Sequence, residues 1–175
     1  MHHFVRRGVW LTLGLVVFGC GGRGGSAATL PGGNKVAILV YSDRGISEAT
    51  PESDTEQVNQ LTDWMESDLI AILKKTGYDA TMVANKDEPT AVGRYLLRTQ
   101  VVNYNGGNKA AREFVGWGAG AARLQTHFEL IGPNGSVYVA GSPNVASSRI
   151  NWQHVARKVN LQTVDSVNQR LRRGL

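Results

Sequence analysis

The sequence is poor in the residues that form covalent crosslinks and metal sites. It has one cysteine, Cys20, and four histidines among 175 residues. A single thiol forms no disulfide within the chain, so we expect the fold to rest on its hydrophobic core alone. Beyond the first few residues the histidines are His127 and His154, and neither belongs to a set of cysteine and carboxylate residues that would complete a metal site. We therefore expect surface histidines, no metal site and no cofactor.

Motifs for catalysis and nucleotide binding are also scarce. The sequence contains no G-x-S-x-G turn of the kind that presents a nucleophilic serine. Gly116, Gly118 and Ala121 fit the spacing G-x-G-x-x-A, but that motif binds dinucleotides only where a helix follows it. Here a strand pattern follows, so nucleotide binding is not expected. The sequence favours a protein that is not an enzyme.

The apolar stretch near the N-terminus is too short for a permanent membrane span. Residues 8–18 (GVWLTLGLVVF) would extend roughly 16 Å as a helix, against about 30 Å for the hydrocarbon core. The basic residues Arg6 and Arg7 precede this stretch, and the order is typical of an export signal. We predict a signal peptide over residues 1–19.

Val17-Phe18-Gly19-Cys20 resembles the lipobox of bacterial lipoproteins, in which signal peptidase cuts just before a cysteine that then receives lipid. Cys20 is thus the predicted lipidation site, and several acyl chains on it would hold the protein at a membrane. Gly21 differs from the aspartate associated with inner-membrane retention, which favours the outer membrane and a domain facing the periplasm. The inner membrane is the alternative. An ordinary secretory signal cut at Ser26-Ala27-Ala28 is the alternative to lipidation.

The net charge is +5, and much of the excess lies late in the chain. The late cations are Arg149, Arg157, Lys158, Arg170, Arg172 and Arg173. Basic clusters bind nucleic acid or anionic membranes, but an exported protein rarely meets nucleic acid, so we expect no nucleic-acid partner. A solvated helix face and contact with anionic headgroups are the two remaining interpretations.

Residues 20–34 have no hydrophobic period and are rich in glycine, which predicts a flexible tether with a reach of roughly 20 Å. Residues 35–175 are predicted to form a single domain. Its first elements are a strand over 35–42 and a helix in which apolar residues recur every three or four positions. That helix begins near Ser53 and Glu56, carries acidic residues including Asp68 on a solvated face, and ends before Gly77.

Further strands are expected over 78–84, 94–104, 123–130 and 136–140, with a hairpin turn at residues 132–135. One or two helices follow from about Asn151, with a break near Asn160 as one option. The order β-α-β-β-β-β-α predicts an α/β fold of the α+β sandwich type. The sheet should be mixed and largely antiparallel, with one long helix after the first strand and a C-terminal helix.

Residues 106–122 (GGNKAAREFVGWGAGAA) are unusual because Gly116, Gly118 and Gly120 surround the single large side chain of Trp117. The glycines permit close approaches of the backbone. Trp117 is either a plug beneath this segment or an exposed contact residue.

This segment, the alternating strand after it and the Asn134-Gly135 hairpin resemble the DUF4410 family of bacterial lipoproteins of unknown function. The shared layout is a glycine turn, a basic stretch, an aromatic G-x-G-A-G-A-A run, a strand and a hairpin. The resemblance implies a lipoprotein with a compact α/β domain, related to TolB N-terminal regions, curli-secretion lipoproteins and activators of peptidoglycan synthases. It implies no catalytic residues.

These features predict a non-enzymatic envelope lipoprotein that is anchored through Cys20 and acts as a binding or assembly module for another envelope protein. The candidate contact residues are Gly116, Trp117, Gly118 and Gly120. The alternative is a periplasmic small-molecule or glycan-binding lipoprotein in which the Trp117 ring stacks on a sugar. A hydrolase acting on cell-wall material is a third reading.

Overall fold

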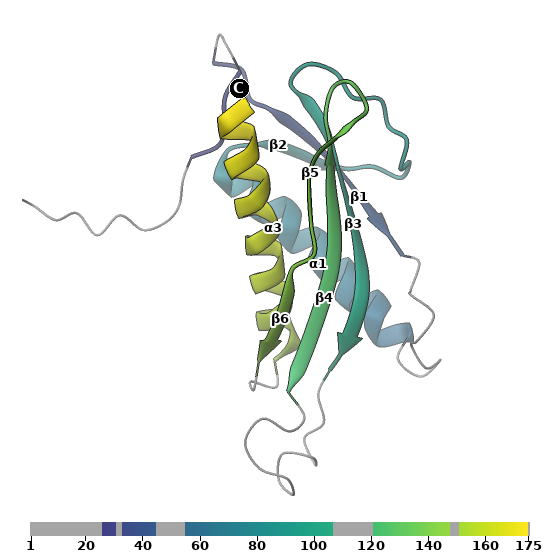
Figure 1. The fold of residues 1–175 in the computed structure, drawn as a ribbon. Helices are drawn as coiled ribbons and strands as arrows, with labels where there is room; N and C mark the ends of the chain where they lie inside the picture. Colours follow the sequence, from purple (N-terminus) through teal and green to yellow (C-terminus); the bar gives the residue numbers. More distant parts are fainter. Residues whose placement is uncertain (1–25, 31–32, 45–54, 107–120, 148–150, 175) are drawn as a thin grey trace, which may run out of the picture.

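The computed structural model describes residues 26–30, 33–44, 55–106, 121–147 and 151–174 (Figure 1). The predicted signal peptide, Cys20, Ser53, and the contact residues Gly116, Trp117, Gly118 and Gly120 lie outside the described residues. Within the described ranges, two helices cover one face of a six-stranded mixed sheet. This arrangement confirms the predicted α/β sandwich, with a long helix after the first strand and another at the C-terminus.

The first half of the domain is a strand–helix–strand unit. β1 (Ala37–Asp43) leads into α1 (Thr55–Thr76), and α1 leads into β2 (Asp79–Met82), which pairs with β1 in parallel. The apolar residues that recur along α1 at helical spacing are all buried, as predicted: Val58, Leu61, Met65, Leu69 and Ile72. Their burial, rather than helix propensity alone, holds this long helix on the sheet.

Gly77 ends α1, as the sequence predicts. Its φ of 113° lies in the left-handed region that side chains disfavour. The Gly77 amide donates to the carbonyl of Lys74 at 3.0 Å, and the Tyr78 amide donates to that of Leu73 at 3.1 Å. These two hydrogen bonds together form the Schellman motif, which provides donors for the last carbonyl groups of the helix.

The second half of the sheet is antiparallel. Its strands are β3 (Arg94–Asn105), β4 (Ala122–Ile131), β5 (Val137–Gly141) and β6 (Asn144–Ser147). The strand order is β2-β1-β3-β4-β5, and β6 pairs with β4 on the same side as β5. β3 is parallel to β1 and antiparallel to β4. The predicted hairpin joins β4 to β5, with Gly135 at a φ of 76°.

Three details differ from the sequence-based expectation. β6 was not predicted, because Val145 is its single buried residue and gives no alternating signal. β2 is shorter than the predicted 78–84 strand, since Tyr78 belongs to the helix cap. The C-terminal helix α3 (Trp152–Gly174) continues through Asn160 without a break. Asn160 is buried and bonded to α1, so tertiary contacts offset its weak helix propensity.

The N-terminal residues that precede β1 pack on the domain. The Ala27 amide donates to the carbonyl of Thr76 at 2.8 Å, and the Ala28 side chain is buried. Thr29 forms an isolated antiparallel bridge with Lys35. These contacts lie inside the range predicted as a tether, and they bring residues 26–30 into the folded domain.

Candidate functional site

The domain has two distinct ends, set by the direction of its strands and helices. At one end α1 and α3 finish, and Arg172 in the last turns of α3 donates from Nε at 3.0 Å, and also from Nη2, to the backbone oxygen of Ser26. We call this the Ser26 end. At the opposite end β3 stops at Asn105 and β4 starts at Ala122 (Figure 1). We call this the Asn105 end.

The predicted contact segment is attached to the Asn105 end. Residues 107–120 join β3 to β4, so both of their attachment points lie there. The contact segment and the N-terminal segment therefore leave the domain from opposite ends. The side chain of Trp117 lies outside the described residues, so both interpretations of it, plug and contact, stay open.

Three aromatic side chains are half-buried near the same end. Trp64 of α1 and Trp152 of α3 meet edge to face, with ring centroids 5.6 Å apart and planes at 84°. Both, together with Tyr104 of β3, pack against a buried cluster that contains Leu61 and Leu124. Aromatic rings that are partly exposed and held rigid make good contact surfaces. The sequence analysis did not single out these rings as a group, because residues far apart in sequence bring them together.

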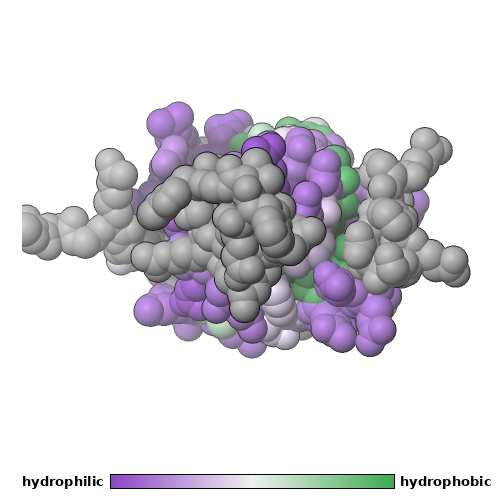
Figure 2. All heavy atoms as spheres, turned by 90° about the horizontal axis from the view of Figure 1, so that it is seen from below, coloured by the Kyte–Doolittle hydropathy of each residue, from purple (hydrophilic) through white to green (hydrophobic). Residues whose placement is uncertain are grey.

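A polar groove of about 320 Å³ crosses the sheet face beside this end. It is lined by Asn103, Asn105, Arg123, Gln125, Asn144 and Ala146. The strand register places Gln125 opposite both Asn103 on β3 and Asn144 on β6. Side-chain amides donate and accept hydrogen bonds, so this lining suits hydroxyl-rich or peptide-like ligands. Seen from the Asn105 end, the described surface is mostly hydrophilic with smaller apolar areas (Figure 2).

A polar layer divides the core beneath the helices. It contains the buried side chains of Thr62, Thr126, Asn160 and Thr163. The layer separates an apolar cluster toward the Ser26 end from a second one toward the Asn105 end. A cavity of about 20 Å³ lies at this level, which is room for about one water molecule. Every buried side-chain nitrogen and oxygen among the described residues has a hydrogen-bond partner.

An ion pair ties α1 to α3 next to this layer. Asp68 is buried, with its carboxylate 2.7 Å from Arg157 Nη1 and 3.1 Å from Asn160 Nδ2. Asn160 Nδ2 also donates to the backbone oxygen of Met65 at 3.0 Å. The expectation that Asp68 lies on a solvated face is therefore wrong. The burial of Asp68 could not be predicted from the sequence of α1, because its partners Arg157 and Asn160 lie on α3.

A second ionic cluster lies where β1 ends. Arg44 Nη2 is 2.7 Å from Asp63 and 3.0 Å from Glu66, two acidic residues of α1. The negative charge of Glu66 raises the pKa of Arg44 above its ordinary value. Arg44 is cationic like any arginine, and its two ion pairs hold the end of β1 against the helix.

The two histidines are not brought together. His127 on β4 lies with Nδ1 3.1 Å from Ser142 Oγ and Nε2 3.6 Å from Glu129. His154 is half-buried in the first turn of α3. Within the described ranges no three His, Cys, Asp or Glu side chains gather as metal ligands. In the same ranges neither helix is long and apolar enough to cross a bilayer.

Comparison with solved structures finds a similar fold in a protein whose structure is a dodecamer. The PelC dodecamer from Paraburkholderia phytofirmans superposes with a TM-score of 0.52 at 16% identity, covering 82% of this chain and 93% of that one. A point variant of the same protein gives a TM-score of 0.47 at 16% identity, covering 82% and 92%. A comparison with curated protein sequences finds no match.

The family resemblance is confirmed by a direct match. Residues 28–151 match the model of the domain of unknown function DUF4410. The match begins at Ala28, the first buried residue of the described chain, and continues through all six strands. This chain therefore belongs to the DUF4410 family.

Proposed function

We propose that this chain is a lipid-anchored envelope protein that acts by binding rather than by catalysis, and that it assembles with other copies of itself or with another envelope protein. The lipid on Cys20 anchors the protein in the outer membrane, and the domain faces the periplasm. The contact surface is the Asn105 end, including Gly116, Trp117, Gly118 and Gly120.

The packing of residues 26–30 is the observation that carries the anchoring at Cys20, the part of the proposal on which the location of the protein depends. A secretory cut at Ser26-Ala27-Ala28 would remove or expose the buried Ala28 and break the backbone bond from Ala27 to Thr76. Cleavage before Cys20 leaves these contacts whole. The packing therefore favours the lipobox over the alternative cut.

Two further observations support a role in assembly. A protein of similar fold forms a dodecamer, so the fold is compatible with self-assembly. The N-terminal segment and the contact segment leave from opposite ends of this domain, which leaves the Asn105 end accessible when the Ser26 end is held at a membrane.

The anchor is tested by the mass of the mature N-terminal peptide from the membrane fraction. We expect a peptide that begins at residue 20 with the added mass of acyl chains, and a Cys20→Ser chain that is released from the membrane. An unmodified N-terminus at residues 27–29 would contradict the anchor.

Assembly is tested by light scattering and native mass spectrometry of the lipidated protein in detergent, with Trp117→Ala as the variant. We expect a discrete oligomer, and we expect Trp117→Ala to weaken it without changing the melting temperature. Loss of several kcal/mol of stability, as for a buried aromatic truncated to alanine, would make Trp117 a core residue and contradict its contact role.

Glycan binding is the second candidate function, supported by the amide-lined groove on the sheet. Calorimetric titration with envelope oligosaccharides tests it. We expect Gln125→Ala and Asn144→Ala to weaken binding, while His154→Ala, which lies outside the groove, leaves it unchanged. A glycan that binds all three variants equally would contradict this site.

A further inference from the structure

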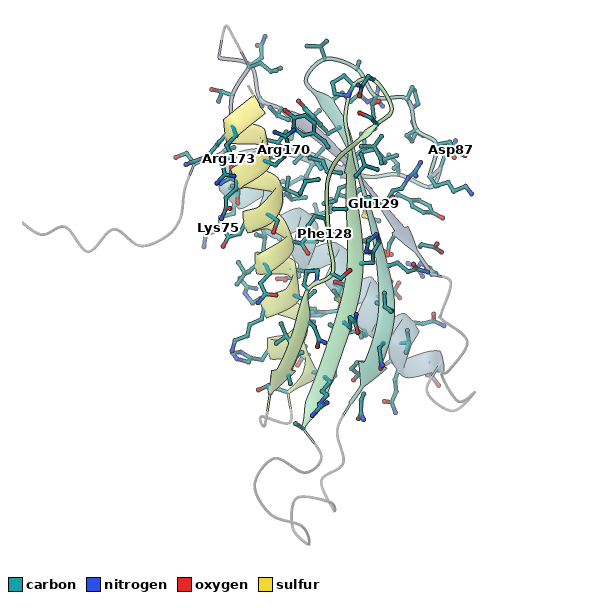
Figure 3. The ribbon with its side chains drawn as sticks, viewed as in Figure 1. Lys75, Asp87, Phe128, Glu129, Arg170 and Arg173 are labelled. Carbon is teal, nitrogen blue, oxygen red and sulfur yellow. The ribbon has the colours of Figure 1, made fainter. Side chains whose placement is uncertain are left out.

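The Ser26 end concentrates positive charge. Around the chain entry and the two helix ends, residues 26–30, 33–37, 72–79 and 168–174 contain six cationic side chains and one acidic residue, Asp79. The cations are Lys35, Lys74, Lys75, Arg170, Arg172 and Arg173. The start of β3, which also lies at this end, adds the ion pair of Arg94 with Glu88. Figure 3 shows Lys75 of α1 and Arg170 and Arg173 of α3 toward the end of the domain where the two helices finish. Residues far apart in the sequence thus form one basic surface.

Cations elsewhere in the domain are mostly neutralised by ion pairs. Arg44, Arg94, Arg98 and Arg157 each lie within 4.0 Å of a carboxylate. Within the described ranges Lys74, Lys75 and Arg173 form no such pair, and all three are exposed. Lys86, Arg123 and Lys158 are exposed cations too, but they lie on three separate segments outside this end, so the exposed cations are most concentrated at the Ser26 end.

Internal structure accounts for only part of this cluster. Cations in the last turn of a helix interact favourably with its dipole, which suits Lys74, Lys75 and Arg173. Arg170 lies 4.1 Å from the centroid of the Tyr138 ring and donates to the Tyr138 carbonyl, while Arg172 holds Ser26. The dipole explains why cations are tolerated at each helix end. The dipole does not explain why the ends of α1 and α3 and residues 26–30 bring these cations to the same end of the domain.

The position of the predicted anchor indicates that phospholipid headgroups are what this surface contacts. Ser26 is the sixth residue after Cys20, so a fully extended chain between them spans about 20 Å at most. The hydrogen bonds from Arg172 fix Ser26 beside the basic cluster. A lipid on Cys20 therefore keeps the cluster within about 20 Å of the membrane surface, from where it can approach the headgroups to within the Debye length of roughly 8 Å at physiological salt.

We propose that the basic surface formed by Lys74, Lys75, Arg170, Arg172 and Arg173 contacts anionic phospholipid headgroups and orients the domain on the membrane. This inference rests on the proposed anchoring at Cys20 and adds a second, electrostatic signal to it. The Ser26 end then faces the bilayer, and the Asn105 end faces away from it. Paired acyl and basic signals are a common means of stable membrane attachment.

The test removes the lipid so that the basic surface acts alone. The processed chain beginning at residue 20 and carrying Cys20→Ser is sedimented with vesicles of phosphatidylcholine, with and without phosphatidylglycerol. We expect binding only to the vesicles with phosphatidylglycerol, and we expect added salt to weaken it. The variant Lys74→Gln/Lys75→Gln/Arg173→Gln should bind on the order of a hundredfold more weakly, since each surface cation contributes roughly fivefold.

A matched control loses the same charge elsewhere. Lys86→Gln/Arg123→Gln/Lys158→Gln replaces three exposed cations outside the Ser26 end, and we expect it to keep most of the binding. Equal binding to neutral vesicles, equal losses in the two triple variants, or undiminished binding of the first triple variant would each overturn the proposal. If the first triple variant melts early, Lys75→Gln alone should still weaken binding roughly fivefold. The mass of the Cys20 peptide in the native chain is independent of these results, so the anchor can stand where this inference fails.

Discussion

Arg157 on α3 holds the buried carboxylate of Asp68 on α1, with Nη1 2.7 Å from Oδ1 across 89 residues of sequence. The two partners are buried to different extents. The Arg157 side chain is 54% exposed, whereas the Asp68 side chain is 8% exposed. Removing either partner therefore leaves the other in a different environment.

We expect Arg157→Ala to lower the free energy of unfolding by about 2–4 kcal/mol, because it leaves a buried carboxylate with less compensation. Asp68→Asn should cost only about 1 kcal/mol, because the remaining arginine is free to be hydrated. Urea unfolding at neutral pH measures both. Arg123→Ala, an exposed arginine on β4, is the control and should change stability by less than about 0.5 kcal/mol. A larger loss for Asp68→Asn than for Arg157→Ala would contradict this reading.

The buried hydroxyl of Tyr78 predicts a loss of stability in alkali. It donates to Asn168 Oδ1 at 2.6 Å and accepts from the Ala28 amide at 3.4 Å, and burial raises its pKa. Because the unfolded chain ionises first, stability should be constant below about pH 10 and should fall as pH rises through the raised pKa. Burial also raises the pKa of Tyr95, so both residues contribute.

Tyr78→Phe separates the two contributions. It should lower stability at neutral pH by about 1–2 kcal/mol, the cost of its hydrogen bonds, and it should make the alkaline loss shallower. Denaturant unfolding as a function of pH provides the measurement. An alkaline slope identical to that of the unmodified chain would show that Tyr78 does not titrate with folding.

Gly141 on β5 lies directly beneath the ring of its cross-strand partner Phe128. A Cβ at this position would lie 2.7 Å from Phe128 Cε1. We expect Gly141→Ala to cost about 1–3 kcal/mol, because the fully buried ring has little room to move. Gly132→Ala is the matched control, since its Cβ would meet no atom closer than 3.6 Å. Thermal melting should separate the two variants, and equal melting temperatures would refute the steric argument.

The packing of the N-terminal residues predicts slow hydrogen exchange there. The amides of Ala27 and Leu30 donate to Thr76 and Asn34, at 2.8 and 3.0 Å. We expect peptides covering residues 26–30 to exchange more slowly than unstructured chain in hydrogen-exchange mass spectrometry. Exchange at the rate of a free peptide would place these residues in the tether after all and would remove the structural argument against a cut at Ser26-Ala27-Ala28.

Much of the fold could be predicted from local patterns in the sequence. The spacing of Val58, Leu61 and Met65 predicted α1, and Gly77 predicted its end, because helix periodicity and caps depend on near neighbours. Strict alternation from Arg123 to Leu130 predicted β4 with one buried face. The glycine-rich segment around Trp117 and the Asn134-Gly135 hairpin are equally local, so they predicted a family that the direct match confirms.

The tertiary structure decided what depends on partners distant in sequence. Asp68 looked like one more acidic residue of a solvated helix, and only the approach of α3 made it a buried ion pair. The sequence suggested a helix break near Asn160, but its side chain donates to the backbone oxygen of Met65 on α1 and the helix continues. Likewise, Lys75 and Arg173 form one basic end only because two helices finish side by side. The sequence determined the elements because their signals repeat within a few residues, whereas the surfaces and polar networks depend on packing between elements.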